Sequence, residues 1–372
     1  MIAGAPRPAA AATRRWSIRM ERRLEPPAWA PLTTLLAVFF ALVVSGLIIA
    51  LVGGDPIRSY AHIFNAAFGS VGVISDTLVK ATPLILTGLA CAFAFRMRLW
   101  NIGAEGQLLL GAWGASAVVL VPLVPAGTPG FLLLPAMMLA GFACGALWGL
   151  IPGILKAYFA VNEIIVTLML NYIALLWIQY WVFGPWSEGG FQMTRQFPKE
   201  AWLPRLTDLS TAVPAFSGLT VHLGLVIAVV AAGVLWFVLG RSPWGYVIRL
   251  VGDSPQAARY AGVNIRRNVV LVFVVSGGLA GLAGMSEISG VVHRLQDNFS
   301  PGYGFTAIII AYLARFQPLG VIVASVLFGA LILAGREIQP SGIPAMIQGI
   351  VLFAVITSDV LIRYRVSLRR GA

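Results

Sequence analysis

Long apolar runs separated by short polar segments make up most of this chain of 372 residues. Many of these runs approach the roughly 20 residues that a helix needs to cross a lipid bilayer. The pattern predicts an all-α polytopic membrane protein with about ten transmembrane helices. We place these helices near residues 31–52, 74–95, 104–121, 131–154, 163–183, 219–239, 268–290, 303–315, 318–335 and 343–362.

Two of the predicted spans are irregular. The third begins in the polar, glycine-rich segment 101–107, directly after an apolar run. The eighth is a short apolar run, 305–314, preceded by Pro301-Gly302-Tyr303-Gly304. Short, glycine-broken segments at corresponding places in two halves are typical of transporters with internal repeats. We therefore expect two pseudo-repeated halves with broken helices, related by either an inverted or a parallel repeat.

The longest polar and basic break between apolar halves lies at 241–268, where five arginines accompany a single acid, Asp253. The residues that follow are Ser254, which has a capping hydroxyl, and Pro255, which suits the first turn of a helix. They predict a short helix that ends at Gly262. Such a helix could dock onto a soluble partner, and an ordinary solvated loop is the alternative.

Most of the 26 lysines and arginines fall on one side of the predicted spans when the N-terminus is placed inside. Lys80 is counted with the few basic residues of the outer side. Because basic residues concentrate in cytoplasmic segments, we expect both termini to be cytoplasmic, which requires an even number of spans. The predicted parts are a basic tail (1–30), a transmembrane domain (31–362) with an outer loop (184–218) and a cytoplasmic loop (241–268), and a second tail (363–372).

Composition supports a membrane protein, because 59% of the residues are hydrophobic and only 11% are charged, against about 25% charged in soluble domains. The net charge of +12 raises the alternative of nucleic-acid binding. The arginines flank apolar spans instead of forming a basic face with aromatics, so no nucleic-acid partner is expected. Cys91 and Cys144 both lie within apolar runs, and this placement does not support a disulfide framework.

Motifs of soluble catalysis are missing from the sequence. None of the three lysines follows a glycine, so the chain has no GxxxxGK[ST] phosphate loop. The histidines are scattered and show no metal-ligand spacing, so no metal site is expected. The dinucleotide-like pattern at 302–307 does not follow a strand and is better explained as a helix break. With no nucleophile or acid–base set either, the chain is not expected to be an enzyme.

Several polar side chains lie within or at the ends of apolar spans, where such groups usually face a bundle interior or a cavity. They fall in two groups near the third and fifth spans, with one threonine in the eighth: Asn101, Glu105 and Gln107; Asn162, Glu163 and Asn171; and Thr306. They could line a pathway, or their hydrogen bonds could join helices. Asn162 could simply cap the fifth span.

Glycines recur at every fourth residue of the fourth predicted span, at positions 141, 145, 149 and 153. Two more, Gly277 and Gly281, have the same spacing in the seventh span. This spacing lets helix backbones approach closely, so we expect these spans to pack tightly.

Two motifs carry a resemblance to a known family. Trp100-Asn101-Ile102-Gly103-Ala104-Glu105-Gly106-Gln107, followed by LLLGA, closely resembles the signature of bacterial ABC-transporter permeases of the nucleoside/simple-sugar type. Val161-Asn162-Glu163-Ile164-Ile165 with Met169-Leu170-Asn171-Tyr172 is similar to a second motif of that group, which belongs to the branched-chain amino acid/ribose permease superfamily. The resemblance covers about residues 55 to 360. Gln317 stands where related sequences often have asparagine.

The resemblance implies a permease subunit of an ATP-driven importer in the bacterial inner membrane. Its partners would be a homologous second permease, cytosolic ATPases that hold ATP and magnesium, and an outer substrate-binding protein; the chain itself would hold no cofactor. It also implies that the central loop contains a coupling helix for the ATPase, with Asp253, Ser254, Pro255, Ala258, Arg259, Tyr260, Gly262 and Asn264.

We expect cargo to be nucleosides or related small polar solutes, passing between this chain and its homologue. The polar residues of the broken spans would line or gate that passage. Simple sugars or branched-chain amino acids are the alternative cargo. An ion-coupled secondary transporter, with Glu105, Glu163 or Glu287 as the ion site, is the alternative mechanism.

Overall fold

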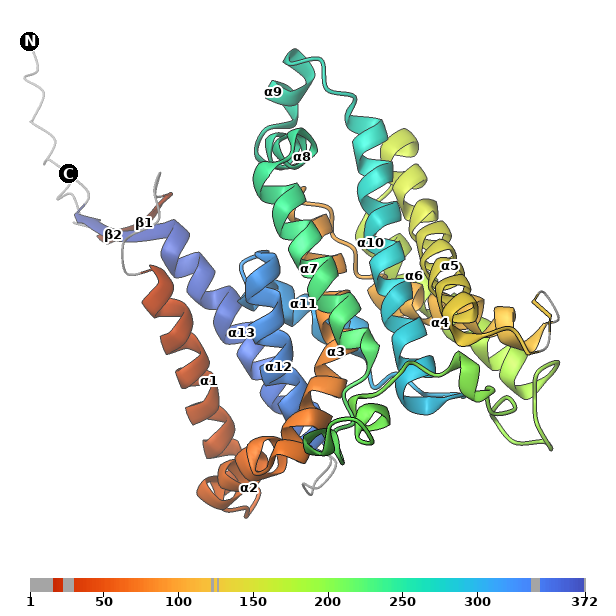
Figure 1. Cartoon of the computed structure of the whole chain (residues 1–372). Helices are drawn as coiled ribbons and strands as arrows, with labels where there is room; N and C mark the ends of the chain where they lie inside the picture. Colours follow the sequence, from red (N-terminus) through yellow and green to blue (C-terminus); the bar gives the residue numbers. More distant parts are fainter. Residues whose placement is uncertain (1–15, 23–29, 122–123, 126, 336–341, 371–372) are drawn as a thin grey trace, which may run out of the picture.

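The computed structural model describes residues 16–22, 30–121, 124–125, 127–335 and 342–370 as a bundle of helices (Figure 1). Ten helices coincide with the ten predicted spans. They are α1 (Ala30–Leu51), α3 (Val71–Arg96), α4 (Ala104–Leu120), α5 (Gly130–Phe159), α6 (Glu163–Phe183), α7 (Leu223–Arg241), α10 (Ile265–Glu287), α11 (Tyr303–Leu313), α12 (Pro318–Ala334) and α13 (Ile343–Arg363).

The ten helices differ in length. Among the described residues, six helices are long and apolar enough to cross a membrane, and a seventh span results if α1 and the helix after it count as one bent unit. The helices α4, α11 and α12 are shorter, with 17, 11 and 17 residues. At 1.5 Å per residue, 11 residues reach only about 17 Å of a core about 30 Å thick. The polytopic α-helical class is confirmed, and the number of ten complete crossings stays a prediction.

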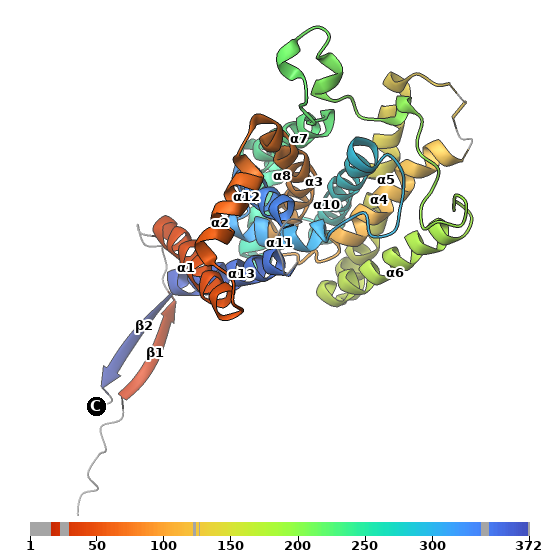
Figure 2. The same ribbon diagram turned by 90° about the horizontal axis from the view of Figure 1, so that it is seen from below.

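Three further helices lie where the sequence pattern showed only connectors or a polar loop. They are α2 (Pro56–Phe68), α8 (Pro243–Asp253) and α9 (Pro255–Tyr260). Only α9 was predicted. The start of α2 is capped by Asp55, whose carboxylate accepts hydrogen bonds from the backbone N–H groups of Ile57 and Arg58. The chain turns by 119° between α1 and α2, so α2 lies across the bundle instead of along it (Figures 1 and 2).

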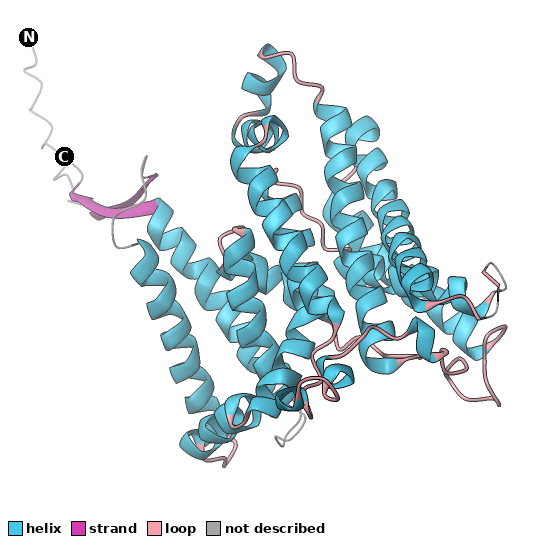
Figure 3. Cartoon of the chain, in the orientation of Figure 1, coloured by secondary structure: helices cyan, strands magenta, loops and turns pink. Residues whose placement is uncertain are grey.

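Strands β1 (Trp16–Arg22) and β2 (Tyr364–Arg370) pair antiparallel and project from the helices (Figure 2). The sequence analysis did not predict these two strands, because the terminal segments contain no apolar run whose periodicity could indicate a strand. In Figure 3 they are the two magenta arrows beside the otherwise helical bundle. The rest of the predicted cytoplasmic tails, residues 1–15, 23–29 and 371–372, lies outside the described residues.

The helices α3 and α10 run antiparallel at the centre of the bundle. Ser276 of α10 donates a hydrogen bond to the carbonyl of Ala90 at 2.7 Å, and Glu287 lies beside Lys80, so rising numbers in α10 meet falling numbers in α3. Each of these helices is followed by a broken segment and a short helix, α4 or α11. Antiparallel placement of two such units is the relation of an inverted repeat, and it favours the inverted of the two arrangements.

Glycines bring α4, α5 and α10 into backbone contact. A Cβ atom on Gly281 of α10 would lie 2.2 Å from the carbonyl oxygen of Gly141 in α5. A Cβ atom on Gly111 of α4 would lie 2.2 Å from the Cα of Gly281. Real Cβ atoms do not approach other atoms so closely, so these positions admit no side chain unless the helices move apart. The predicted tight packing of the glycine-bearing spans is confirmed, with α4 as an additional partner.

We predict that Gly281→Ala lowers the stability of the folded protein by about 1–3 kcal/mol, the usual effect of overpacking. The matched control is Gly233→Ala in α7, where an added Cβ meets nothing within 4 Å. Thermal unfolding of both variants in detergent measures the difference. Equal melting temperatures for Gly281→Ala and Gly233→Ala would contradict the packing argument.

The loop between α6 and α7 is ordered and lies across the end of α10. It contains three 3-10 turns, Lys199–Ala201, Leu206–Leu209 and Pro214–Phe216. Backbone N–H groups of Phe197 and Leu203 donate to the carbonyls of His293 and Ser289, at 2.8 and 3.0 Å. Ser289 lies in the π-helical turn Ile288–Val292 that ends α10, and His293 follows this turn directly. The loop is therefore held to the transmembrane helices by its backbone.

Two histidines that are far apart in the sequence both lie near Arg205 of this loop. The guanidinium of Arg205 lies 2.7 Å from Nε2 of His293 and donates to the carbonyl of Gly290. The Nδ1 atom of His222 accepts a hydrogen bond from the backbone N–H of Gly224 and so caps α7. Burial, followed by the charge of Arg205, lowers the pKa of each histidine to about 4.

We predict that stability falls as the pH drops from about 6.5, the ordinary histidine pKa, towards 4. Because the folded pKa of His222 and His293 is depressed, the unfolded chain binds more protons in this interval, and proton binding favours unfolding. The stabilisation that comes from keeping both histidines neutral in the folded protein is complete above about pH 6.5. His222→Asn keeps a side-chain acceptor for the cap without titrating, so its melting temperature should change less between pH 7.5 and 5. An unchanged pH profile in this variant would contradict the assignment.

Candidate functional site

The start of α4 is held by a pair of side-chain amides. Asn101 donates to Oε1 of Gln107 at 2.8 Å, and Gln107 donates back to Oδ1 of Asn101 at 3.1 Å. Asn101 also donates to the hydroxyl of Ser276 in α10, at 2.9 Å. Both amides are buried. The pair closes the polar segment 101–107 on itself and attaches it to the central helix.

Asn171 of α6 binds the same segment from the other side. Its Oδ1 accepts from the backbone N–H of Gly106 at 2.8 Å, and its Nδ2 donates to the carbonyl of Ile102 at 2.9 Å. One turn away on α6, the hydroxyl of Thr167 accepts from the N–H of Ile102 at 3.3 Å. Asn171 therefore satisfies one donor and one acceptor of a backbone that begins a helix inside the bundle.

Glu105 connects the starts of α4 and α11. Its Oε2 accepts a hydrogen bond of 2.6 Å from the backbone N–H of Gly304, in the first turn of α11. Glu105 is itself in the first turn of α4, so its carboxylate lies at two helix N-termini, where the helix dipole favours negative charge. A Cβ atom on Gly304 would lie 2.2 Å from the backbone nitrogen of Glu105, so the two helix starts touch directly.

The remaining predicted pathway residues lie beside this junction or at the start of α6. Thr306, in α11, donates to Oε1 of Gln348 in α13, at 3.2 Å. Asn162 caps α6 by accepting from the N–H of Ile164. Glu163 forms an ion pair of 2.7 Å with Lys156, at the turn between α5 and α6. Each of the seven predicted pathway residues thus has a partner within the chain, and their contact with cargo stays a prediction.

A buried charge pair beside the junction was missed at the sequence level. Lys80 of α3 forms an ion pair of 2.9 Å with Glu287 at the end of α10, and both are buried, with 6% and 1% of their surface exposed. Lys80 also donates to the hydroxyl of Tyr303, the first residue of α11, which lies 3.2 Å from Oε1 of Glu287. Placing Lys80 on the outer side was therefore wrong. The signal was a lysine inside an apolar run, which is costly unless it has a partner.

We predict that Lys80→Met destabilises the protein by about 3–5 kcal/mol, because it leaves the carboxylate of Glu287 buried without a counter-charge. The double variant Lys80→Met with Glu287→Gln removes both charges and should recover most of the loss. Thermal unfolding and the yield of monodisperse protein in detergent measure both variants. If the double variant is no more stable than Lys80→Met, the pair does not act as a compensated ion pair.

A second feature lies at the end of the bundle, where α8 and α9 project beyond the other helices (Figure 1). Ser254, and not Asp253, caps α9 by accepting from the N–H of Ala257, while Asp253 ends α8. Within α9, Ala258 is buried, whereas Tyr260 is 95% exposed and Arg259 is exposed. The helix ends before Gly262, which has a φ of 74° that suits glycine.

The remaining contacts of this arm show how it is connected to the bundle. Asn264 caps α10 by accepting from the N–H of Arg267 at 3.0 Å. A Cβ atom on Gly252 of α8 would lie 2.5 Å from the carbonyl oxygen of Arg96, so α8 rests on the end of α3. The short helix predicted in the central loop is confirmed, and its role stays a prediction.

Within the described part of the chain, no group of three or more histidine, cysteine or carboxylate side chains could hold a metal ion. The polar groups at the junction instead bind backbone and one another. The arrangement can fix the position of two broken helices within a membrane, which is the construction of a transport protein.

The fold and this junction define a polytopic membrane transport protein. The chain matches, over residues 73–357, the family described as branched-chain amino acid transport system / permease component, and it belongs to this family.

Named relatives cover most of this chain. It is 37% identical to the glucose ABC transporter permease protein TsgB13 of Haloferax volcanii, over 95% of both chains. It is 36% identical to the guanosine ABC transporter permease protein NupP of Bacillus subtilis, over 87% of this chain and 91% of the relative. It is 32% identical to the nucleoside ABC transporter permease protein NupB of Lactococcus lactis, over 87% of this chain and 89% of the relative.

Proposed function

We propose that this chain is the membrane-spanning permease subunit of an ATP-driven ABC importer for nucleosides or related small polar solutes. Family membership and the names of the relatives support the transporter class. In this proposal the chain is not an enzyme, and ATP and magnesium bind to a separate ATPase subunit. The chain lies in the inner membrane, with α9 and both terminal strands on the cytoplasmic side.

The observation that carries the coupling role is the projecting helix α9. A capped helix of six residues with an exposed tyrosine and an exposed arginine, Tyr260 and Arg259, is a small rigid element that a groove of an ATPase can hold. The coupling set also includes Asp253, which lies 3.9 Å from Arg98 just after α3. A displacement of α9 would pass through α8 to the end of α3.

The route from α3 to the junction is short. The segment 97–103 connects the end of α3 to α4, and its Asn101 holds both α4 and α10. Movement of α3 would therefore shift the junction of α4 and α11 at Glu105. Cargo would pass between this chain and a second permease subunit, with the two short helices forming part of the wall.

A homologous second permease is the proposed membrane partner. The two guanosine transporter permease proteins of Bacillus subtilis, NupP and NupQ, match this chain with 36% and 29% identity. Because the two differ in their similarity to this chain, a pair of unlike permeases is favoured over a pair of copies. An outer substrate-binding protein would complete the importer and set most of the cargo specificity.

Simple sugars are the second candidate cargo, because a relative with 37% identity is named as a glucose permease. The family description also names branched-chain amino acids. Uptake of labelled guanosine, glucose and leucine by cells with and without the transporter separates these classes. The ion-coupled alternative predicts uptake by the isolated chain under an ion gradient without any ATPase. It is less favoured, because Glu105 and Glu163 already have partners within the chain.

We predict that Tyr260→Ala combined with Arg259→Glu lowers uptake by about tenfold or more, since loss of an exposed tyrosine and reversal of a charge at a docking site typically cost over 1.4 kcal/mol. The measurement is co-purification of the ATPase with the detergent-solubilised chain, together with uptake in cells. The folded chain should be unaffected, because both side chains point into solvent.

The matched control is Tyr180→Ala with Arg195→Glu, an exposed tyrosine and arginine near the opposite end of the bundle. It should leave ATPase co-purification unchanged. If the α9 variant and the control bind the ATPase equally well, the coupling role of α9 is wrong, whatever the cargo proves to be.

A further inference from the structure

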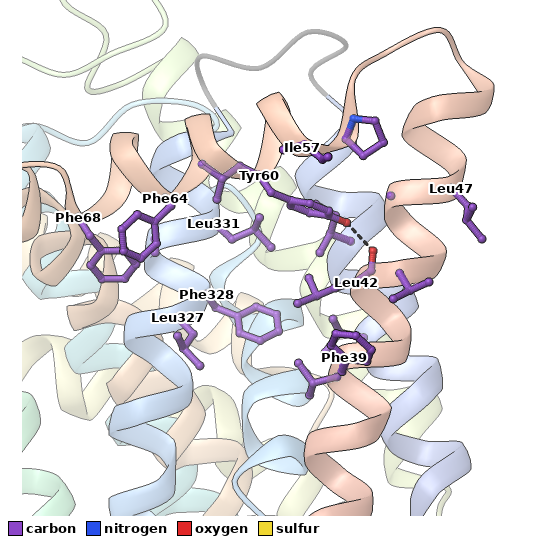
Figure 4. Close-up of a pocket in the computed structure, with 18 of the residues that line it drawn as sticks. Phe39, Leu42, Leu47, Ile57, Tyr60, Phe64, Phe68, Leu327, Phe328 and Leu331 are labelled. Atoms are coloured by element: carbon purple, nitrogen blue, oxygen red, sulfur yellow. Dashed lines mark hydrogen bonds between the residues drawn. The ribbon is translucent and has the colours of Figure 1, made fainter.

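A large apolar pocket lies between α1, α2 and α12, away from the junction of α4 and α11. It has a volume of about 810 Å³. Figure 4 shows Phe39 and Leu42 on α1 across from Phe328 on α12, with Tyr60 and Phe64 of α2 at one end of the space. Helix α1 packs along α13, and the pocket separates α1 from α12.

The chemistry of the wall excludes polar cargo. Of the described residues that line the pocket, only Tyr60 carries a polar side-chain atom. Its hydroxyl already donates to the carbonyl of Leu42, at 2.6 Å, as the dashed line in Figure 4 marks. A nucleoside or a sugar placed here would lose its hydrogen bonds to water without gaining others. The pocket therefore suits an apolar ligand and does not belong to the proposed transport pathway.

The position of α2 shows which way a ligand would enter. One face of α2 carries Ile57, Tyr60 and Phe64, which line the pocket, and the other face carries Arg58 and Asn65. A helix with opposed apolar and polar faces, lying across the ends of spanning helices, is typical of the membrane interface. The pocket thus begins at the level of lipid headgroups and extends among the spanning helices.

The pocket opens to the outside of the bundle, because several of its lining side chains, among them Phe39, Phe64 and Leu327, are exposed. Hydrocarbon chains are narrower than a helix and are present at this depth of any bilayer. An apolar wall offers water no hydrogen-bond partners and favours an apolar ligand.

An exposed cation lies on α2, at the residue that follows the lining residue Ile57. The side chain of Arg58, next to the lining residue Ile57, is 90% exposed, and its Nε lies 3.3 Å from the carboxylate of Asp55. Exposed ion pairs of this kind contribute little, so the guanidinium remains able to bind a phosphate. A lipid whose acyl chain enters the pocket beside α2 would bring its headgroup phosphate to the helix that carries this arginine.

We propose that this pocket binds an acyl chain of a membrane phospholipid, with Arg58 at the headgroup phosphate. The lipid completes the packing between α1 and α12 and holds α2 at the membrane interface. The ligand class is a phospholipid, recognised by an apolar wall and one guanidinium. This inference requires only that the chain lies in a membrane, and it is independent of the cargo and of the ATPase.

The test uses the purified full-length chain in lipid nanodiscs that contain phosphatidylglycerol with a photoreactive diazirine in one acyl chain. After illumination, peptide mass spectrometry locates the labelled segments. Labelling should concentrate on α1, α2 and α12, and should exceed that of the lipid-facing side of α6. Equal labelling of α6 and of the pocket helices would overturn the proposal.

Filling the pocket provides the decisive comparison. Leu42→Trp with Leu327→Trp should lower labelling of the pocket by roughly fivefold or more, because the new rings occupy the space in which the chain makes its dispersion contacts. The control is Leu176→Trp on α6, since Leu176 is 64% exposed and Leu327 is 54% exposed. If the double variant does not fold, Ala50→Phe fills the pocket from an exposed position. Unchanged labelling in the filled variants would contradict the assignment.

Two further experiments test the headgroup contact and the identity of the occupant. Arg58→Gln should reduce labelling by phosphatidylglycerol by about twofold to threefold, as expected for the loss of one exposed phosphate contact, and no effect would remove Arg58 from the site. A photoreactive benzoylphenylalanine at position 39, incorporated in cells, should crosslink to lipid. A crosslink from this position to another protein would overturn the lipid assignment in favour of a protein interface.

Discussion

A helix that begins inside a bilayer exposes backbone N–H groups where no water is available to bind them. Both α4 and α11 begin in this way, within a bundle, and much of the central polar chemistry satisfies the resulting donors. Asn171 accepts from Gly106, and the carboxylate of Glu105 accepts from Gly304. These side chains are amides and carboxylates because such groups accept strong hydrogen bonds and, for the carboxylate, interact favourably with helix dipoles. The polar residues of the membrane domain are thus primarily the supports of two broken helices.

This construction also explains why glycine is needed around the same centre. The supports reach the helix starts only if α4, α5 and α10 lie closer together than side chains permit. Gly111, Gly141 and Gly281 allow backbone contact between these three helices, and Gly304 allows α11 to touch the first turn of α4. In a membrane, where burial of apolar surface does not drive helices together, such close van der Waals packing is a principal source of stability. The packed centre would therefore shift as a unit when its attachments move.

The attachments lie at opposite ends of the molecule and differ in kind. At one end, α8 rests on the end of α3 and presents α9 to solvent, which suits the proposed transfer of motion from an ATPase. At the other end, the loop after α6 is tied by its backbone to the π-helical end of α10, over two buried histidines. The lipid pocket lies to the side, between α1, α2 and α12. These three regions surround a centre that carries the broken helices.

The sequence by itself determined the class of protein, the positions of ten helices and the breaks before α4 and α11. The length of an apolar run and the placement of glycines are local properties, which can be recognised without knowledge of the fold. It also determined the short helix in the central loop, from Ser254, Pro255 and Gly262. It did not reveal α2, since an amphipathic helix lying at the interface has no long apolar run. Only the tertiary structure decided that Lys80 contacts Glu287, that Arg205 contacts His293, and that Glu105 binds Gly304. These pairs are separated by 88 to 207 positions in the chain. The packing of the helices decides which residues become partners, and no local sequence pattern contains that information.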